Sequence, residues 1–266
     1  MCRFLAYHGE PILLEELICA GDHSLIHQSL HAIECKTGTN GDGFGLGWYG
    51  ERQTPGLFRD LRPAWADENL RSLCEQVRSP LFFAHVRAAT GTATSRPNCH
   101  PFAQDRWLFM HNGQIGDYGR VKRQLESALP DALYDARQGT TDSELLFLLT
   151  LARLTAGMAP AEALADVLGE VKALMVAAGI AEPLRFTATL SDGRTLWAVR
   201  TACDGRPASL YLQERSRSVV IASEPLEMRR EGWHAVAPNS LITVSRRGEV
   251  VITPFFIPMA ESRSAA

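Results

Sequence analysis

Short apolar runs and alternating apolar and polar positions recur along the chain, which predicts several strands. In the first half we expect strands over residues 3–7, 81–87 and 107–110, and the first should stop at Gly9 to Pro11 because these residues favour turns. In the second half, strand-like segments alternate with turn residues and predict a second sheet: residues 184–190, 195–200, 209–212, 219–222 and 240–244.

Apolar residues three and four positions apart predict helices between these strands. We expect one helix over residues 11–31, one that begins near residue 142, and one over residues 160–178. Residues 255–258 are expected to form a docked strand ahead of a frayed tail. The order of these separate strands and helices allows an α+β fold.

The composition predicts a cytoplasmic protein with a large core. The 266 residues are 45% hydrophobic, which is enough for one large domain, and a net charge of −3 gives no basic footprint for nucleic acid or an acidic membrane. No apolar run reaches the roughly 18 residues of a membrane span, and no signal-peptide pattern opens the sequence. The six cysteines form no CxxC pair, which argues against a disulfide framework and a zinc knuckle.

Cys2 is the first candidate for chemistry. An initiator methionine before a small residue is normally removed, so the mature chain should begin with a cysteine that carries both a thiol and a free α-amine. A thiol needs help to lose its proton, and an α-amine with a pKa of about 8 can accept it. The alternative is that Cys2 is a small hydrophobic residue at the start of a strand.

One histidine pattern and one glycine pattern each suggest a ligand site, but other features of the sequence argue against both sites. His23, His27, His31 and Cys35 follow at four-residue steps, as a metal site on one helix would require, but no carboxylate or second cluster supports that site. Residues 45–50 match GxGxxG, yet residues 51–56 form a turn where a dinucleotide site needs a helix. We therefore expect no metal site at the histidines. We expect the glycine-containing segment to form a strand that another part of the backbone approaches closely.

Three later segments carry polar groups that could face a ligand. Arg87 ends a buried strand, where a guanidinium requires an anion, either a ligand carboxylate or an internal acid. Asn112 and Gly113 form either a tight turn or an oxyanion hole. Before the next helix, a Thr or Asp of residues 140–142 caps its start, or Asp142 holds the ammonium group of an amino-acid ligand.

Together these segments resemble the class II glutamine amidotransferases, whose catalytic domain is an N-terminal-nucleophile hydrolase. The resemblance covers roughly residues 2 to 225, and six motifs occur in the family's order, followed by Ala222-Ser223-Glu224-Pro225. The six motifs are Cys2, Asp42-Gly43-Phe44-Gly45, Ala84-His85-Val86-Arg87, His100-Pro101-Phe102, His111-Asn112-Gly113-Gln114 and Thr141-Asp142-Ser143-Glu144.

This resemblance implies a four-layer αββα sandwich and an acyl transfer to water without a cofactor. Cys2 would attack the side-chain amide of glutamine or a γ-glutamyl compound, and Asn112 with Gly113 would form the oxyanion hole. Arg87 would bind the substrate α-carboxylate and Asp142 its α-ammonium group. Ala88-Ala89-Thr90-Gly91 departs from the Trp-Ala-Thr-His-Gly of synthase-fused members, which leaves Thr90 as a second carboxylate partner.

The chain is most similar to the stand-alone branch of the family, which includes the γ-glutamyl hydrolase of ergothioneine synthesis. We expect one amidotransferase domain over residues 1–254 and a tail over residues 255–266, because no P-loop or other synthase motif follows residue 150. The protein would then either pass ammonia to a separate synthase or hydrolyse a γ-glutamyl amide itself. The rival hypothesis is a non-catalytic module that binds glutamine.

Overall fold

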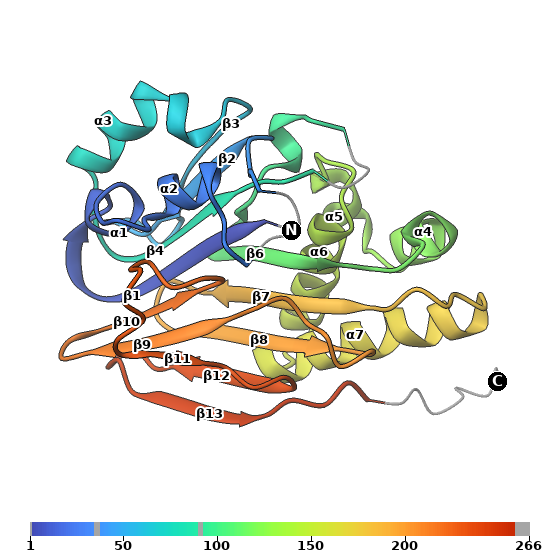
Figure 1. Ribbon diagram of the computed structural model, residues 1–266. Coiled ribbons are helices and arrows are strands. Elements are labelled where there is room, and N and C mark those ends of the chain that lie inside the picture. The colour runs from blue at the N-terminus through green and yellow to red at the C-terminus, as the bar shows by residue number, and fades with distance from the viewer. Residues whose placement is uncertain (1, 35–37, 90–92, 259–266) are drawn as a thin grey trace.

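Two antiparallel sheets lie face to face in the centre of the protein (Figure 1). The computed structural model describes residues 2–34, 38–89 and 93–258. The first sheet has the strand order β11-β9-β10-β1-β4-β2-β3, and the second has the order β13-β12-β8-β7-β6-β5. The strand that begins next to Cys2, β1, is therefore central in its sheet.

The strands of the first sheet come from both ends of the sequence. They are β1 (Arg3–Leu13), β2 (Phe44–Trp48), β3 (Gly56–Asp60), β4 (Arg78–Val86), β9 (Tyr211–Arg215), β10 (Ser218–Ala222) and β11 (Trp233–Ala235). The second sheet consists of β5 (Phe102–Gln104), β6 (Trp107–Gln114), β7 (Arg185–Ser191), β8 (Leu196–Ala202), β12 (Ser240–Val244) and β13 (Val250–Pro254).

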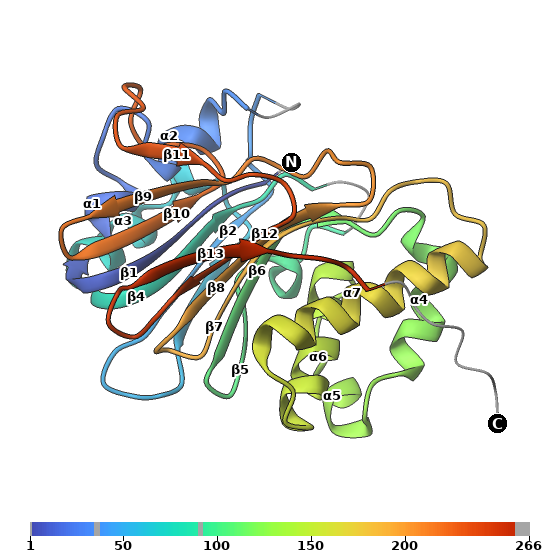
Figure 2. The same ribbon diagram turned by 90° about the horizontal axis from the view of Figure 1, so that it is seen from below.

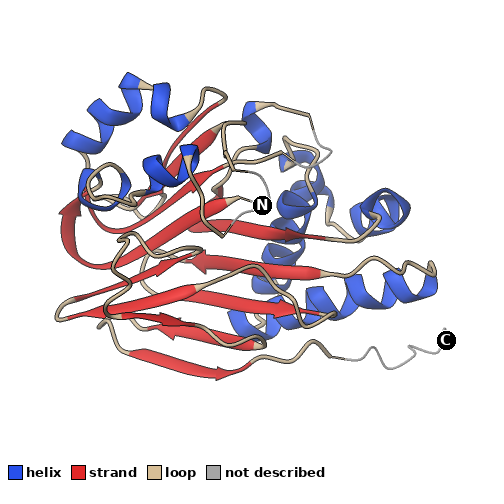
Figure 3. Cartoon of the chain, viewed as in Figure 1, coloured by secondary structure: helices blue, strands red, loops and turns tan. Residues whose placement is uncertain are grey.

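Helices cover the two outer faces of this pair of sheets, in two groups that Figures 2 and 3 show on opposite sides of the strands. The helices α1 (Glu15–Ile18), α2 (Leu25–Leu30) and α3 (Glu68–Gln76) pack on the first sheet. The helices α4 (Tyr118–Ser127), α5 (Asp131–Ala136), α6 (Asp142–Thr155) and α7 (Pro160–Ala177) pack on the second. The expected four-layer αββα sandwich is confirmed. Within the described residues, no helix combines the length and the apolar character that crossing a bilayer requires.

The alternation of side chains along β1 explains how one strand serves two cores. Phe4 and Ala6 pack between the sheets, whereas Leu5 and Tyr7 pack against the helices outside the first sheet. Successive side chains of a strand point to opposite faces, so a strand between two apolar layers must be apolar at every position. This requirement accounts for the unbroken apolar run at the start of the sequence.

The segment after residue 7 differs from its expected structure. The first strand does not stop at Pro11 but continues to Leu13, with an irregular register against β4 between His8 and Ile12. Pro11 has no N–H to donate and falls within this irregular stretch, where a proline is tolerated. The single helix expected over residues 11–31 is therefore wrong, and two short helices, α1 and α2, replace it.

Residues 255–258 also differ from expectation, since the last strand is β13 and ends at Pro254. Phe255 is nevertheless buried in the core of the second helical layer. The strand expected over residues 209–212 begins at Tyr211 instead.

The glycine-containing segment forms a strand, as expected, and another part of the chain lies directly against it. A Cβ at Gly45 of β2 would lie 2.2 Å from the carbonyl oxygen of His100. The absence of a side chain at position 45 thus allows the 100–102 segment to pack on β2. This packing brings His100 towards the end of the sheets at which Cys2 lies.

Candidate active site

One cavity of about 810 Å³ collects the candidate residues from four distant parts of the sequence. Cys2, Arg87, Asn112, Gly113 and Asp142 all line it. Thr90, the other candidate, lies outside the described residues. The cavity lies where β1 begins and β4 and β6 end, so the antiparallel sheets bring these strand ends together.

Cys2 lies directly before β1, and its sulfur rests on the backbone of Ala88. The Ala88 N–H donates to Cys2 Sγ at 3.4 Å, and Sγ lies 3.6 Å from the Ala88 carbonyl oxygen. Burial raises the pKa of the Cys2 thiol above its usual value, while the Ala88 N–H and the positive charges of Arg87 and Arg3 oppose this rise. The thiol therefore needs a proton acceptor before it can act as a nucleophile.

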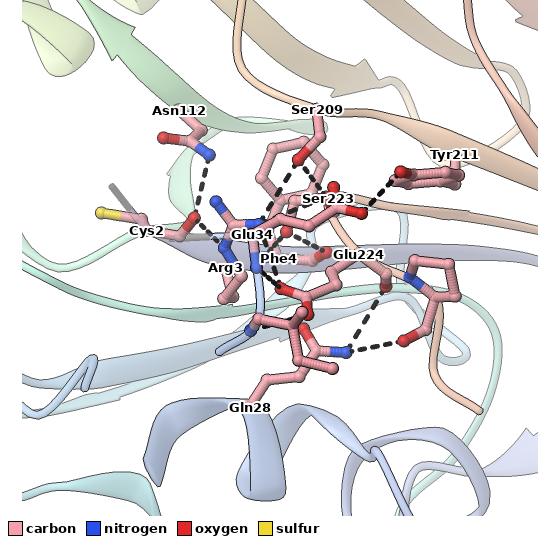
Figure 4. Close-up of polar contacts among 12 residues, drawn as sticks. Cys2, Arg3, Phe4, Gln28, Glu34, Asn112, Ser209, Tyr211, Ser223 and Glu224 are labelled. Carbon is pink, nitrogen blue, oxygen red and sulfur yellow. Dashed lines mark hydrogen bonds and ion pairs between the residues drawn. The ribbon is translucent and has the colours of Figure 1, made fainter. Parts of the chain in front are cut away.

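The carbonyl oxygen of Cys2 receives two hydrogen bonds from opposite sides. Asn112 Nδ2 donates to it at 2.9 Å from the second sheet, and Arg3 Nε donates at 2.8 Å from the first (Figure 4). Both donors are buried, so little water competes for the carbonyl. The orientation of Cys2 is thus fixed by contacts to both sheets.

Asn112 and Gly113 lie inside strand β6 and do not form the tight turn considered from the sequence. They pair with Thr187 and Phe186 of β7, and a Cβ at Gly113 would lie 2.1 Å from the Arg185 carbonyl oxygen. On the other side of β6, the pairing found with β5 ends at Phe109 in the described residues. The backbone edge beyond Phe109 is therefore available to the cavity, and only glycine fits at position 113.

Arg87 follows β4 and is 3% exposed. Its backbone N–H donates to the Gly43 carbonyl at 2.8 Å, and its guanidinium donates to the carbonyl oxygens of Asp42 at 3.4 Å and Ala93 at 3.3 Å. Asp42 itself accepts from the Ala89 N–H at 2.7 Å. The glycine-rich segment before β2 thereby holds the arginine at the cavity wall.

Asp142 opens α6, but the helix is capped by the preceding residue. Thr141 Oγ1 accepts from the Glu144 N–H at 3.2 Å. The Asp142 carboxylate accepts from the Ile115 N–H at 2.9 Å and the Ser143 N–H at 2.8 Å, and it remains half-buried in the cavity. Thr141 therefore caps the helix, and the hypothesis that Asp142 binds a ligand ammonium group does not compete with capping.

Two comparisons with known proteins now bear on this geometry. The family model for class II glutamine amidotransferases matches residues 18–212. The probable glutamine amidotransferase DUG3 of Saccharomyces cerevisiae is 34% identical over 297 residues, which covers 93% of this chain and 82% of the yeast protein. The chain belongs to the class II glutamine amidotransferases.

Further relatives agree with this membership. The γ-glutamyl-hercynylcysteine sulfoxide hydrolase of Mycolicibacterium smegmatis is 30% identical, covering 96% of this chain and all of that protein. A class II glutamine aminotransferase domain protein from Silicibacter pomeroyi superposes with a TM-score of 0.76 at 36% identity, over 96% of this chain and all of that one. Glutamine phosphoribosylpyrophosphate amidotransferase from B. subtilis has a TM-score of 0.65 at 15% identity, over 97% of this chain and 50% of that one, and it shows a shared fold alone.

Several residues near this cavity belong to the six motifs, but the sequence predicts no role for them. His111 Nδ1 lies 2.9 Å from Ser143 Oγ, which in turn lies 3.3 Å from the Asp142 carboxylate. His85 and His100 stack with their ring centres 4.3 Å apart, and burial lowers the pKa of His85 to about 3 and that of His100 well below its usual value. Both rings are therefore neutral at physiological pH, and His100 lines the cavity.

The histidine steps over residues 23–35 do not form a ladder on one helix. His23 precedes α2 and contacts Glu224 at 2.8 Å, while Cys35 lies outside the described residues. Over residues 2–34, 38–89 and 93–258, no group of three His, Cys, Asp or Glu side chains could hold a metal ion. The side chain of His23 is instead part of a buried cluster around Glu224.

Proposed function

We propose that this amidotransferase hydrolyses the side-chain amide of glutamine or of a γ-glutamyl compound, with Cys2 as the nucleophile. The observation that carries the proposal is the single cavity lined by a thiol, an arginine, an aspartate and an Asn-Gly pair. Cys2 Sγ attacks the amide carbon, ammonia or an amine leaves, and water then releases glutamate from the γ-glutamyl thioester. No cofactor takes part in these reaction steps.

Removal of Met1 supplies the base. The α-amine of a terminal Cys2 has an ordinary pKa of about 8 and takes the thiol proton directly or through one water. The raised pKa of the Cys2 thiol makes this base necessary at neutral pH. The Ala88 N–H, 3.4 Å from Sγ, then stabilises the thiolate.

Asn112 and Gly113 stabilise the negative oxygen that develops on the attacked amide. A side-chain amide has two N–H donors, and Asn112 uses one of them on the Cys2 carbonyl at 2.9 Å. Its second N–H and the Gly113 backbone N–H are the donors that we assign to the oxyanion. Loss of one such donor typically costs a factor of about 10²–10³ in rate.

The two charged residues bind the amino-acid end of the substrate. Arg87 pairs with the α-carboxylate and Asp142 with the α-ammonium group, and Thr90 is the further carboxylate partner that we propose. A guanidinium can bind a carboxylate through two parallel hydrogen bonds, which fixes its orientation as well as its charge. Because the α-carboxylate and the α-ammonium group are both held, the γ-amide of the substrate points towards Cys2.

A substituted γ-glutamyl amide is the favoured substrate class. The cavity of about 810 Å³ extends to Tyr118, Lys122 and Glu182, and pockets of about 300–1,000 Å³ enclose ligands of drug size. The name of the mycobacterial relative, a γ-glutamyl-hercynylcysteine sulfoxide hydrolase, points to the same class. Transfer of ammonia from free glutamine to a separate synthase is the second candidate. All five cysteines in the part of the chain that the structure describes are free, which supports a cytoplasmic location, where thiols stay reduced.

Replacement of Cys2 by alanine should abolish amide hydrolysis without unfolding the chain, because one partly exposed thiol adds only about 1 kcal/mol to the free energy of unfolding. Glutamate release and thermal unfolding measure the two quantities. Cys203→Ala is the matched control, since Cys203 is exposed and does not line the cavity. Full activity in Cys2→Ala would refute the mechanism.

Arg87→Lys should raise KM about tenfold or more with a smaller change in kcat, because a lysine cannot form the two parallel bonds to a carboxylate. Steady-state kinetics measure both constants. A substrate analogue that lacks the α-carboxylate should be insensitive to this replacement. If Arg87→Lys affects both compounds equally, Arg87 does not bind the carboxylate.

A panel of γ-glutamyl compounds separates the two substrate classes. We expect kcat/KM for γ-glutamyl amides with a bulky amine to exceed that for free glutamine, because the extended cavity contacts the amine. Faster turnover of free glutamine than of every substituted amide would favour the ammonia-transfer hypothesis. Processed protein that binds these compounds but cleaves none would favour the binding module.

A further inference from the structure

We propose that Glu224 is a positioning residue for the reaction, which acts on Cys2 through Arg3. The inference rests on the proposed role of Cys2 as the nucleophile. Glu224 is fully buried and does not line the cavity, so it cannot touch the substrate. Its effect must pass through the residues that its carboxylate holds.

The Glu224 carboxylate accepts four hydrogen bonds from three separate segments of the chain. One oxygen accepts from His23 Nε2 at 2.8 Å and from the Ile33 N–H at 2.9 Å. The other accepts from Arg3 Nη1 at 3.3 Å and from the Glu34 N–H at 3.3 Å. A buried carboxylate is costly unless its charge and its lone pairs are matched, and this one is matched on both oxygens.

Arg3 connects the Glu224 carboxylate to Cys2, the proposed nucleophile. Its Nη1 donates to Glu224, and its Nε donates to the Cys2 carbonyl at 2.8 Å (Figure 4). Because the guanidinium is planar and rigid, holding one nitrogen fixes the direction in which the other donates. The Glu224 carboxylate, together with the Ser223 carbonyl that accepts from the same Nη1 at 3.3 Å, thereby sets the orientation of the Cys2 carbonyl relative to Asn112, and with it the position of the thiol on the same residue.

The turn that carries Glu224 is anchored independently of the carboxylate. The Ser223 N–H donates to the Phe4 carbonyl at 2.9 Å, and the Phe4 N–H donates to Ser223 Oγ at 2.9 Å. Gln28 Nε2 donates to the carbonyl oxygens of Glu224 at 3.4 Å and Pro225 at 3.1 Å. A change confined to the carboxylate therefore leaves the turn bound to β1, which separates positioning from folding.

Glu224→Gln should lower kcat by about 10- to 100-fold with KM changed by less than about threefold, because a small misplacement of a reacting group is costly while Arg87 and Asp142 are untouched. Arg3→Lys keeps the positive charge but cannot bridge both partners as a planar fork, so it should give a similar loss. The double variant should be little worse than either single variant, because both act on the same contact. Hydrolysis of a γ-glutamyl amide by Met1-processed protein provides the constants.

His23→Gln is the matched control, because it changes another donor to the same carboxylate and leaves Arg3 in place. A positioning role predicts kcat within about twofold of the unmodified protein, even where the melting temperature falls. Equal kcat in the unmodified protein and Glu224→Gln, per folded molecule, would overturn the inference while leaving the proposed function intact, whatever the result for Arg3→Lys. An unmodified protein that hydrolyses no γ-glutamyl amide would instead refute the proposed function. If Glu224→Gln does not fold, Arg3→Lys, which keeps both buried charges, tests the contact to Cys2 through which Glu224 would act, and an unchanged kcat in that variant would overturn the inference.

Discussion

The carbonyl oxygen of Cys2 is hydrogen-bonded to both sheets of the sandwich. It accepts one hydrogen bond from Arg3 of the first sheet and one from Asn112 of the second. An apolar core between the sheets fixes their separation but not the direction of any single polar group. The two directional bonds supply that direction at the residue that we assign as the nucleophile, and so they link the packing of the sandwich to its chemistry.

Burial around this point has two opposite consequences. It raises the pKa of the Cys2 thiol, which makes a nearby base necessary, and it keeps His85 and His100 neutral beside the cavity. It also strengthens each hydrogen bond to the carbonyl because little water competes there. Desolvation therefore lowers the fraction of Cys2 that is thiolate at rest. It also strengthens the hydrogen bonds that hold Cys2 in the position from which the thiolate would react.

The fold and the membership of the candidate site could be predicted because they depend on local patterns. Alternating apolar positions indicated the strands, and Cys2, Arg87, Asn112 and Asp142 were each marked by a residue type that is costly or unusual at its place in the sequence. The class II amidotransferase family was likewise identified from ordered motifs and is confirmed. The sequence failed where tertiary pairing decided the outcome. Strand β1 runs past Pro11 because Ile12 and Leu13 pair with β4, and Asn112-Gly113 lies in a strand because β7 pairs with it. The contacts of Glu224 join segments more than 180 residues apart, so no local pattern could reveal them.

The account depends most directly on a covalent bond between Cys2 and the γ-glutamyl group. Intact-mass and peptide analysis of Met1-processed protein, quenched in acid during turnover of a γ-glutamyl amide, would detect that bond. We predict a population that carries one γ-glutamyl group, located on the N-terminal peptide that begins with Cys2 and absent from Cys2→Ala. A γ-glutamyl group on another residue, or active protein that retains Met1, would contradict the account.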